Sequence, residues 1–203
     1  MNTLDELITL NKDVTFKCKP AGGAQGEYFA HTLSELAPPA DKKTLELINT
    51  KLTEHAKEFI EFFAKHNSAR FHVQPTSGAS SLAVYAPEAW NDLKAEMLQW
   101  FEMMDEDELE ETGIDWLNEC VVFAEIPESG NYFVMALSGE KEGKIIYSDH
   151  DGLESEIYAN SFNEFLIKFL SSPASQIYHL GCYTRYSDNK TDIQWIPGEV
   201  VKP

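Results

Sequence analysis

Cysteine is scarce in this sequence, and long apolar runs are missing. The chain has three cysteines among 203 residues, and Cys18, Cys120 and Cys182 stand among apolar neighbours without metal-ligand spacing. Because their number is odd, we expect reduced thiols and a cytoplasmic location. The longest apolar stretches, such as Tyr132–Leu137, fall far short of the roughly 20 residues that span a bilayer. The first residues also lack the basic region and apolar core of a signal peptide.

Basic residues are also few in comparison with acidic ones. Lys and Arg number 16 against 34 Asp and Glu, which gives a net charge of −18. A chain this acidic repels phosphate groups, so we expect no nucleic-acid partner and no membrane partner. The charge is compatible with a basic protein partner. An apolar share of 43% with 12% aromatics indicates a folded globular protein and excludes a disordered chain.

The acids are concentrated in one segment. From Ala95 to Glu140 the sequence contains thirteen acids and no Lys or Arg, so this segment carries −13 of the total charge. Trp100, Phe101 and Trp116 are interleaved with the acids, whereas a solvating acidic tail has few aromatic residues. We therefore predict a folded, strongly negative surface.

Motifs for catalysis, cofactors and metals are also missing. The chain has no Gly-x-Ser-x-Gly or Ser-x-x-Lys nucleophile, and no Cys-x-x-Cys or His-x-x-x-His pair. Residues 20–26 form a turn-rich loop without phosphate-binding spacing, and Asp149–Gly152 lacks the later Glu of a calcium loop. The sequence thus predicts no enzyme, no cofactor, no metal and no small-molecule substrate. An enzyme that uses Cys182 or a pair of carboxylates is a further alternative.

Apolar residues that alternate with polar ones, and short apolar runs that end at turn residues, predict short strands. Turn residues separate the last three of these runs, which indicates an antiparallel meander. The expected strands lie at residues 13–19, 70–73, 82–85, 121–125, 132–137 and 144–148. A further strand, at the edge of the sheet, is expected at residues 191–196.

Helical periodicity appears between the strands. Apolar residues at steps of three and four from Leu45 to Phe63 predict one helix, capped by Asp41 and ended by a left-handed Asn67. Further helix starts are expected after Pro87 and at the capping boxes that begin with Asp105 and Ser161. Because strands and helices do not alternate regularly, we predict an α+β fold, a mostly antiparallel twisted sheet packed with several helices.

Several segments resemble motifs of one family. They are Phe62–Phe71, Glu125 with Gly130–Phe133, Gly143–Asp151, Ser161–Leu166, and Leu180–Tyr186 with Gln194–Pro197. In their order from about Thr44 to Pro197 they resemble the SUKH superfamily, which contains bacterial immunity proteins and fungal regulators of cell-wall synthesis. The resemblance implies an α+β fold, no catalytic residues and a binding role. We accordingly divide the chain into an N-terminal strand and loop extension, 1–40, and a SUKH-like domain, 41–203, with a C-terminal extension at 172–203.

The resemblance and the charge together predict a function. The resemblance implies neutralisation of a toxin, often a nuclease, and nucleases need cationic surfaces that an acidic protein can cover. We therefore expect an immunity-type protein that binds a cognate bacterial toxin with a basic surface. The expected partner-binding residues are Glu106, Asp107, Glu108, Glu110, Glu111, Asp149 and Asp151. The alternative is a non-catalytic regulatory or scaffold module that binds the cell's own proteins.

Overall fold

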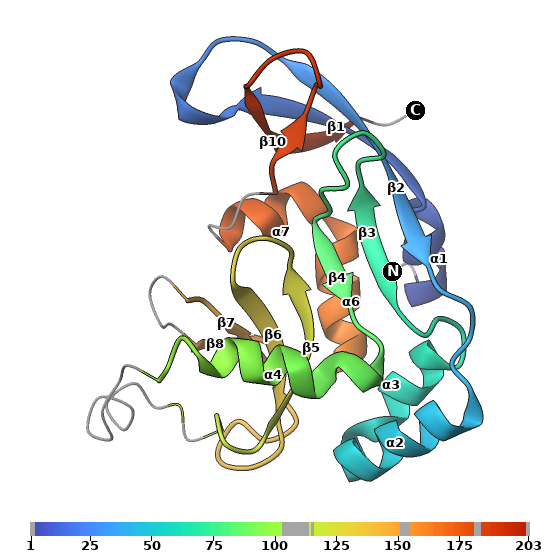
Figure 1. Cartoon of the computed structure of the whole chain (residues 1–203). Helices are drawn as coiled ribbons and strands as arrows, with labels where there is room; N and C mark the ends of the chain where they lie inside the picture. The colour runs from blue at the N-terminus through green and yellow to red at the C-terminus, as the bar shows by residue number, and fades with distance from the viewer. Residues whose placement is uncertain (1–2, 103–113, 115, 151–154, 181–183, 202–203) are drawn as a thin grey trace.

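One antiparallel sheet runs through the molecule (Figure 1). The computed structural model describes residues 3–102, 114, 116–150, 155–180 and 184–201. Within these residues ten strands form the sheet in the order β8-β7-β6-β5-β4-β3-β2-β1-β10-β9, and each neighbouring pair is antiparallel. The strands are β1 Asp13–Pro20, β2 Tyr28–Leu36, β3 Ala69–Val73, β4 Leu82–Val84, β5 Cys120–Ile126, β6 Asn131–Ala136, β7 Ile145–Ser148, β8 Ser155–Ala159, β9 Tyr186–Ser187 and β10 Gln194–Val201.

Helices pack against both faces of the middle of the sheet, so the predicted α+β fold is confirmed. On one face, Phe59 and Phe165 from two helices pack with Phe123 of β5. On the other face, Met97 packs with Val122 of the same strand. Neighbouring residues of a strand point to opposite faces. The helices are α1 Leu4–Leu10, α2 Lys42–Leu52, α3 Ala56–Phe63, α4 Trp90–Leu98, α6 Phe162–Ser171 and α7 Pro173–His179.

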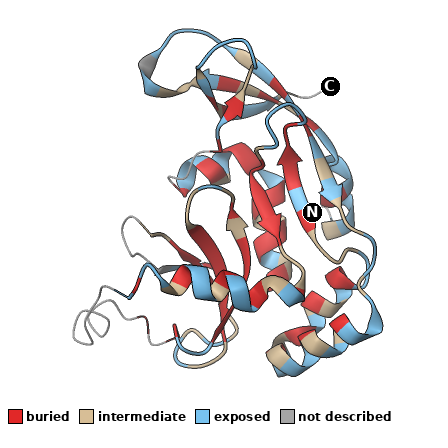
Figure 2. Ribbon diagram, viewed as in Figure 1, coloured by how far each residue is buried: buried red, intermediate tan, exposed pale blue. Residues whose placement is uncertain are grey.

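Coverage of both faces explains the sequence of the central strands. All residues of β6 and all but Glu125 of β5 are buried (Figure 2), so these strands are continuous apolar runs instead of alternating ones. Phe162 at the start of α6 lies at the centre of the aromatic packing, with ring centroids 4.1 Å from Phe59 and 5.6 Å from Phe123. This core positions the β5–β6 turn and the end of β7.

The β1–β2 end of the sheet is covered on one face only. Val14, Phe16 and Cys18 are buried, as the alternating pattern of 13–19 predicts. On the opposite face Phe29 is 54% exposed and Leu33 is 40% exposed. The β1–β2 end is therefore a two-layer structure, whereas the centre of the sheet is the middle of three layers.

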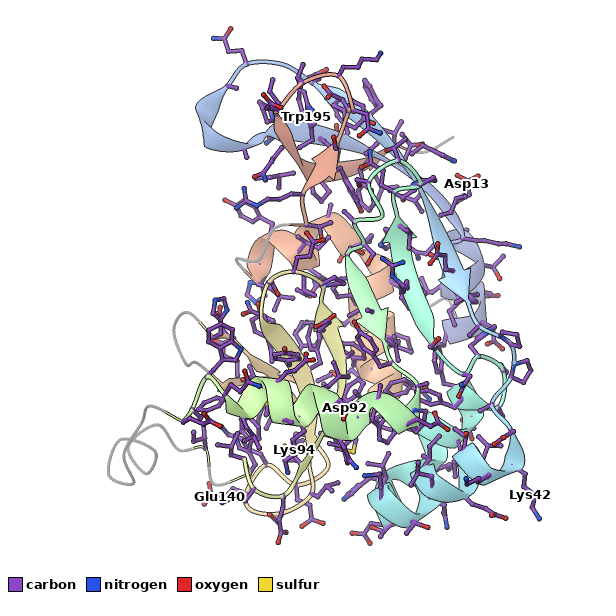
Figure 3. The ribbon with its side chains drawn as sticks, viewed as in Figure 1. Asp13, Lys42, Asp92, Lys94, Glu140 and Trp195 are labelled. Carbon is purple, nitrogen blue, oxygen red and sulfur yellow. The ribbon has the colours of Figure 1, made fainter. Side chains whose placement is uncertain are left out.

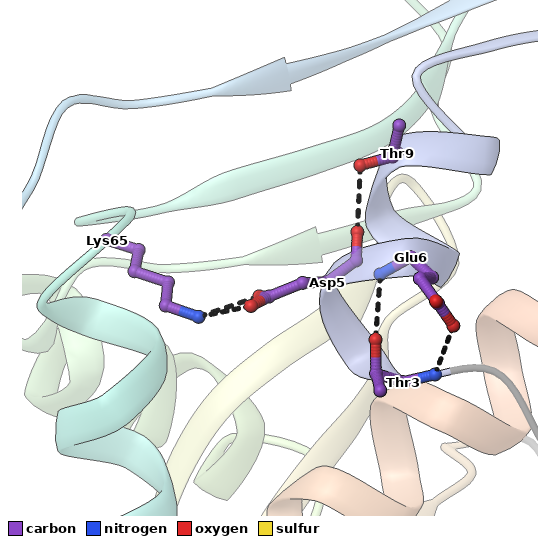
Figure 4. Close-up of polar contacts among 5 residues, drawn as sticks. All are labelled: Thr3, Asp5, Glu6, Thr9 and Lys65. Atoms are coloured by element: carbon purple, nitrogen blue, oxygen red, sulfur yellow. Dashed lines mark hydrogen bonds and ion pairs between the residues drawn. The ribbon is translucent and has the colours of Figure 1, made fainter.

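Helix α1 is fixed at its start and against α3 (Figure 4). Thr3 and Glu6 form a capping box, in which each side chain accepts from the other residue's backbone N–H. The Asp5 carboxylate lies 2.6 Å from Lys65 Nζ, just beyond the end of α3. These contacts hold the N-terminal helix beside the core.

A buried polar network joins α1, β3 and α6. The Nδ2 of Asn11 donates to the carbonyls of Leu7 and Leu170, at 2.8 and 2.9 Å, so its Oδ1 faces His72 Nε2 at 2.8 Å. This arrangement places the imidazole proton on Nε2, and His72 Nδ1 accepts from Ser81 Oγ at 2.6 Å. Burial without a compensating charge lowers the pKa of His72 to about 3.

Two helix predictions were wrong in detail. The segment from Leu45 to Phe63 forms two helices, because Thr53 adopts φ +47° and starts a short 3₁₀ turn, Thr53–His55. Asn67 is not left-handed; its N–H donates to Pro38 O, and α3 ends at Phe63. At Ser161, half of the predicted capping box forms, since the Glu164 carboxylate accepts from Asn160 instead of from Ser161.

The N-terminal strands belong to the same sheet as the rest of the chain. Strand β2 pairs with β3 at Leu33 and Val73, and β1 pairs with β10 from Thr15 to Pro20. Strands β2 and β8 and helices α1 and α7 have no counterpart in the sequence-based assignment. The strand expected at the edge, at residues 191–196, is part of β10, which pairs with β1 and with β9. The division into 1–40 and 41–203 stays a prediction.

Candidate partner-binding surface

Most of the predicted partner-binding residues lie outside the described residues. These are Glu106, Asp107, Glu108, Glu110, Glu111 and Asp151. The chain on either side of the acidic run is well anchored, because Phe101 and Ile114 are both buried in the core cluster beneath α4. The described residues that flank the run therefore lie on the α4 side of the sheet.

Most acids of the base-free segment 95–140 that the structure does describe are exposed. Glu125 is the half-buried exception. Lys94, the residue before this segment, donates to the backbone carbonyl of Asn118 at 2.7 Å, which ties α4 to the chain that enters β5 (Figure 3). The exposed acids are Glu96, Glu102, Glu119, Glu128 and Glu140.

Asp149, the described member of the predicted set, follows β7 and is half-buried. It lines a polar cleft of about 330 Å³. The cleft lies between the β3–β4 hairpin, the β5–β6 turn and the chain that leads to β9. Its charged lining side chains are of both signs: Arg70, Glu128, Asp149 and Arg185.

Both arginines of the cleft donate hydrogen bonds to neighbouring groups of the protein. Arg70 donates to the Glu35 carboxylate at 3.2 Å and to Gly78 O at 2.6 Å. Arg185 donates to Gln194 Oε1 at 2.8 Å. Because each guanidinium already has a protein acceptor, the cleft differs from the open cationic groove that binds nucleic acid.

Asn131 organises the wall of the cleft next to Asp149. Its Oδ1 accepts from the backbone N–H of His150 at 3.1 Å and from the His150 ring Nδ1 at 2.6 Å. Its Nδ2 donates to Tyr147 OH, which in turn donates to Leu180 O. Asn131 is buried, so this network fixes the chain at the end of β7 and the orientation of the imidazole ring.

An exposed tryptophan rests on this network. The ring of Trp100 lies 4.7 Å from that of His150, and the residue is 47% exposed. Gly130 adopts φ +77°, and a Cβ at that position would lie 3.2 Å from His150 Nδ1 and 3.3 Å from Trp100 Cζ2. The turn therefore needs glycine both for its left-handed conformation and for the close approach of two rings.

Glu125 lies beneath α4 in a half-buried acidic pocket. Tyr85 OH donates to its carboxylate. Burial is the main cause that raises the pKa of Glu125; the charge of Glu96 acts in the same direction, and the Tyr85 hydrogen bond opposes both. Burial, with Glu125 and Glu96 nearby, also raises the pKa of Tyr132 to about 12. Glu125 therefore contributes little to the exposed negative surface.

Comparison with known families decides the classification. The model of the SMI1 / KNR4 family (SUKH-1) matches residues 19–168, which is most of the chain. The chain belongs to the SMI1/KNR4 family. No curated protein matches it. Among its described residues, no helix has the length and apolar character needed to cross a membrane.

The matched part of this SMI1/KNR4 domain extends from the end of β1 into α6 and contains Arg70, Glu128 and Asp149 of the cleft. Arg185 lies beyond it. Sequence reasoning missed Trp100 as a surface residue, because an aromatic at helical spacing is more often part of the core. Asn131 and His150 both stood in segments that resemble family motifs, and the structure shows that they hydrogen-bond each other.

Proposed function

We propose that this SMI1/KNR4 protein is an immunity-type inhibitor. It binds a bacterial toxin with a basic surface directly, in the cytoplasm, and blocks it without catalysis. The family is generally one of non-catalytic binding and immunity domains, which supports the binding role.

The base-free segment 95–140 carries this proposal. Thirteen acids without a single Lys or Arg give a local charge of −13, and most of the described acids among them are exposed. A surface of one sign attracts an oppositely charged protein over several ångströms and raises the rate of productive encounter by about 10- to 1,000-fold at low salt. The acidic run 105–111, with Asp149 and Asp151, is the proposed contact region.

Trp100 supplies an anchor for such a contact. Exposed tryptophans held rigid are frequent hot spots of protein interfaces, and an indole face binds Arg or Lys by a cation–π interaction. Trp100 lies between two exposed acids, Glu96 and Glu102, in the sequence and rests on His150. We therefore place a basic side chain of the toxin over Trp100.

A second candidate function is a regulatory module that binds the cell's own proteins. The cleft supports it, since Arg70 and Arg185 face the same space as Glu128 and Asp149. A mixed-charge groove suits a peptide with both signs of charge better than a purely basic surface. This candidate predicts several partners of moderate affinity.

Association kinetics test the first proposal. We expect the triple variant E106K/E108K/E110K to associate with the toxin of a neighbouring gene at least about tenfold more slowly at low salt, with a flatter salt dependence. The matched control E46K/E61K/D192K makes the same change in net charge at exposed positions elsewhere. Equal association rates for the two triple variants would contradict the proposed contact region.

A further inference from the structure

A histidine and two glutamates meet on the side of the molecule formed by the α2–α3 joint. His55 ends the 3₁₀ turn Thr53–His55 between α2 and α3, and Glu142 lies in the β6–β7 turn, 87 residues further along the chain. His55 Nε2 is 3.3 Å from Glu142 Oε1 and 3.9 Å from Glu54 Oε1. One ligand atom from each of the three residues lies within 4.8 Å of the others.

These separations fit ligands of one metal ion. Zinc binds imidazole nitrogen and carboxylate oxygen at about 2.0–2.2 Å, so two ligands at tetrahedral angles are roughly 3.3 Å apart. The His55–Glu142 pair already has this spacing, and the Glu54 carboxylate lies 3.9 Å from the same ring nitrogen. Glu54 and Glu142 are exposed and His55 is partly exposed, so an ion can reach the group and water can complete its coordination.

The backbone holds the imidazole in place. Gly143 adopts φ +73°, and a Cβ there would lie 2.7 Å from His55 Cε1 and 2.9 Å from Nδ1. The ring is thus seated directly against the β6–β7 turn, which presents Glu142. A ligand with a fixed ring position loses less side-chain entropy when it binds a metal.

The charge of the group is unbalanced. Among the described residues, the ion pairs of Glu54 and Glu142 are with His55 alone. Two carboxylates carry two negative charges, and the imidazole supplies at most one positive charge. A divalent cation balances this charge and bonds all three groups at once.

We infer that Glu54, His55 and Glu142 bind a divalent transition-metal ion, and that zinc fits best. Calcium and magnesium take oxygen ligands almost exclusively, whereas zinc accepts a mixture of imidazole and carboxylate. The bound ion links the α2–α3 joint to the β6–β7 turn. This site is independent of the proposed toxin-binding surface, so either proposal can fail without the other.

Calorimetric titration of the tag-free, chelator-treated protein with zinc chloride tests the inference. We expect one ion per chain, with affinity at least about tenfold weaker in H55Q and in E142Q, and an increase of Tm with zinc that both variants lose. The matched control is H31Q, because His31 lies 3.3 Å from Asp13 and, within the part of the chain that the structure describes, forms an ion pair with that carboxylate alone. Circular dichroism verifies that all variants fold.

Two outcomes overturn the inference. The first is the absence of one-to-one zinc binding up to millimolar concentration. The second is binding that H55Q and E142Q leave unchanged or weaken no more than H31Q does, which would assign the zinc to the acidic surface in general.

Discussion

Gly130 determines how close two rings come at the edge of the proposed partner-binding surface. Its φ of +77° turns the chain between β5 and β6, and its missing side chain leaves room for His150 and Trp100. Asn131, the next residue, holds His150 by two hydrogen bonds. A pair of neighbouring residues therefore positions the exposed tryptophan, although both are about 30 positions further along the chain than Trp100.

The variant G130A tests this arrangement. A left-handed alanine costs about 1–2 kcal/mol, and the added Cβ also displaces one of the two rings. The matched control is G78A, since Gly78 has the same φ of +77° with nothing within 4 Å of its added Cβ. We expect G130A to lower the free energy of unfolding, measured by urea denaturation, more than G78A does. We also expect G130A to shift the fluorescence of Trp100. Equal losses with unchanged fluorescence would show that the ring contact is unimportant.

His72 predicts a dependence of stability on pH. The folded state keeps its imidazole neutral down to a pKa of about 3, whereas the unfolded chain takes up a proton near pH 6.5. The stability that comes from His72 is therefore present above pH 6.5 and falls as the pH decreases toward 3. Between pH 7 and pH 5 the loss is about 2 kcal/mol.

The variant H72N measures this contribution. Asparagine is tolerated at the left-handed φ of +55° at this position and does not titrate in this range. We expect the stability difference between wild type and H72N to shrink by about 2 kcal/mol from pH 7 to pH 5, with no such change in the exposed control H179N. A ring resonance of His72 that titrates between pH 5 and 7 in the folded protein would contradict the account.

At the scale of elements, the sequence predicted strands better than helix boundaries. The alternation of Val14, Phe16 and Cys18 was sufficient to predict β1, and the turn residues between the apolar runs were sufficient to predict β5, β6 and β7. Both signals work because burial and turn chemistry act locally. The break at Thr53 was missed, since Leu52 and Ala56 continue the helical spacing across it and a left-handed threonine has no sequence signal. Strand β8 was missed because its apolar residues, Ile157 to Ala159, are too few to show a strand pattern.

The start of helix α6 provides a test at this scale. Ser161 Oγ accepts from the backbone N–H of Glu164 at 3.3 Å, so we expect S161A to lower the free energy of unfolding by about 1 kcal/mol. The matched control is S172A, because Ser172 precedes α7 without a side-chain hydrogen bond to its backbone. Chemical denaturation compares the two, and an equal effect of both substitutions would exclude a capping role for Ser161.

The proposed surface was partly predictable from the sequence. Asp149 was selected because polar residues that leave a strand stand out between apolar runs, and it lines the cleft, while its role in partner binding stays a prediction. The contact of Trp100 with His150 was not predictable, since it joins residues 50 positions apart through a turn whose geometry depends on Gly130. The meeting of His55 and Glu142 was missed for the same reason, because the spacing rules for metal ligands apply to neighbouring residues in the chain.

At the scale of the whole molecule, neither the negative charge nor the helices that cover the sheet are evenly distributed. Within the base-free segment, the end of α4 with the exposed Glu96 covers one face of the central strands, whereas β5 and β6 belong to the sheet itself. The β1–β2 end leaves Phe29 and Leu33 exposed on its uncovered face. The proposed function predicts that a basic partner approaches from the α4 side, because the exposed Glu96 lies there and attracts positive charge.

Co-purification from the native cells at low and at high salt, read by quantitative mass spectrometry, tests the central claim most directly. The account predicts one basic protein, recovered at one copy per chain and retained at high salt once bound, because salt slows the electrostatic encounter more than it weakens a tight, desolvated contact. Recovery of several partners in small amounts, all lost at high salt, would contradict the immunity function and favour the regulatory module.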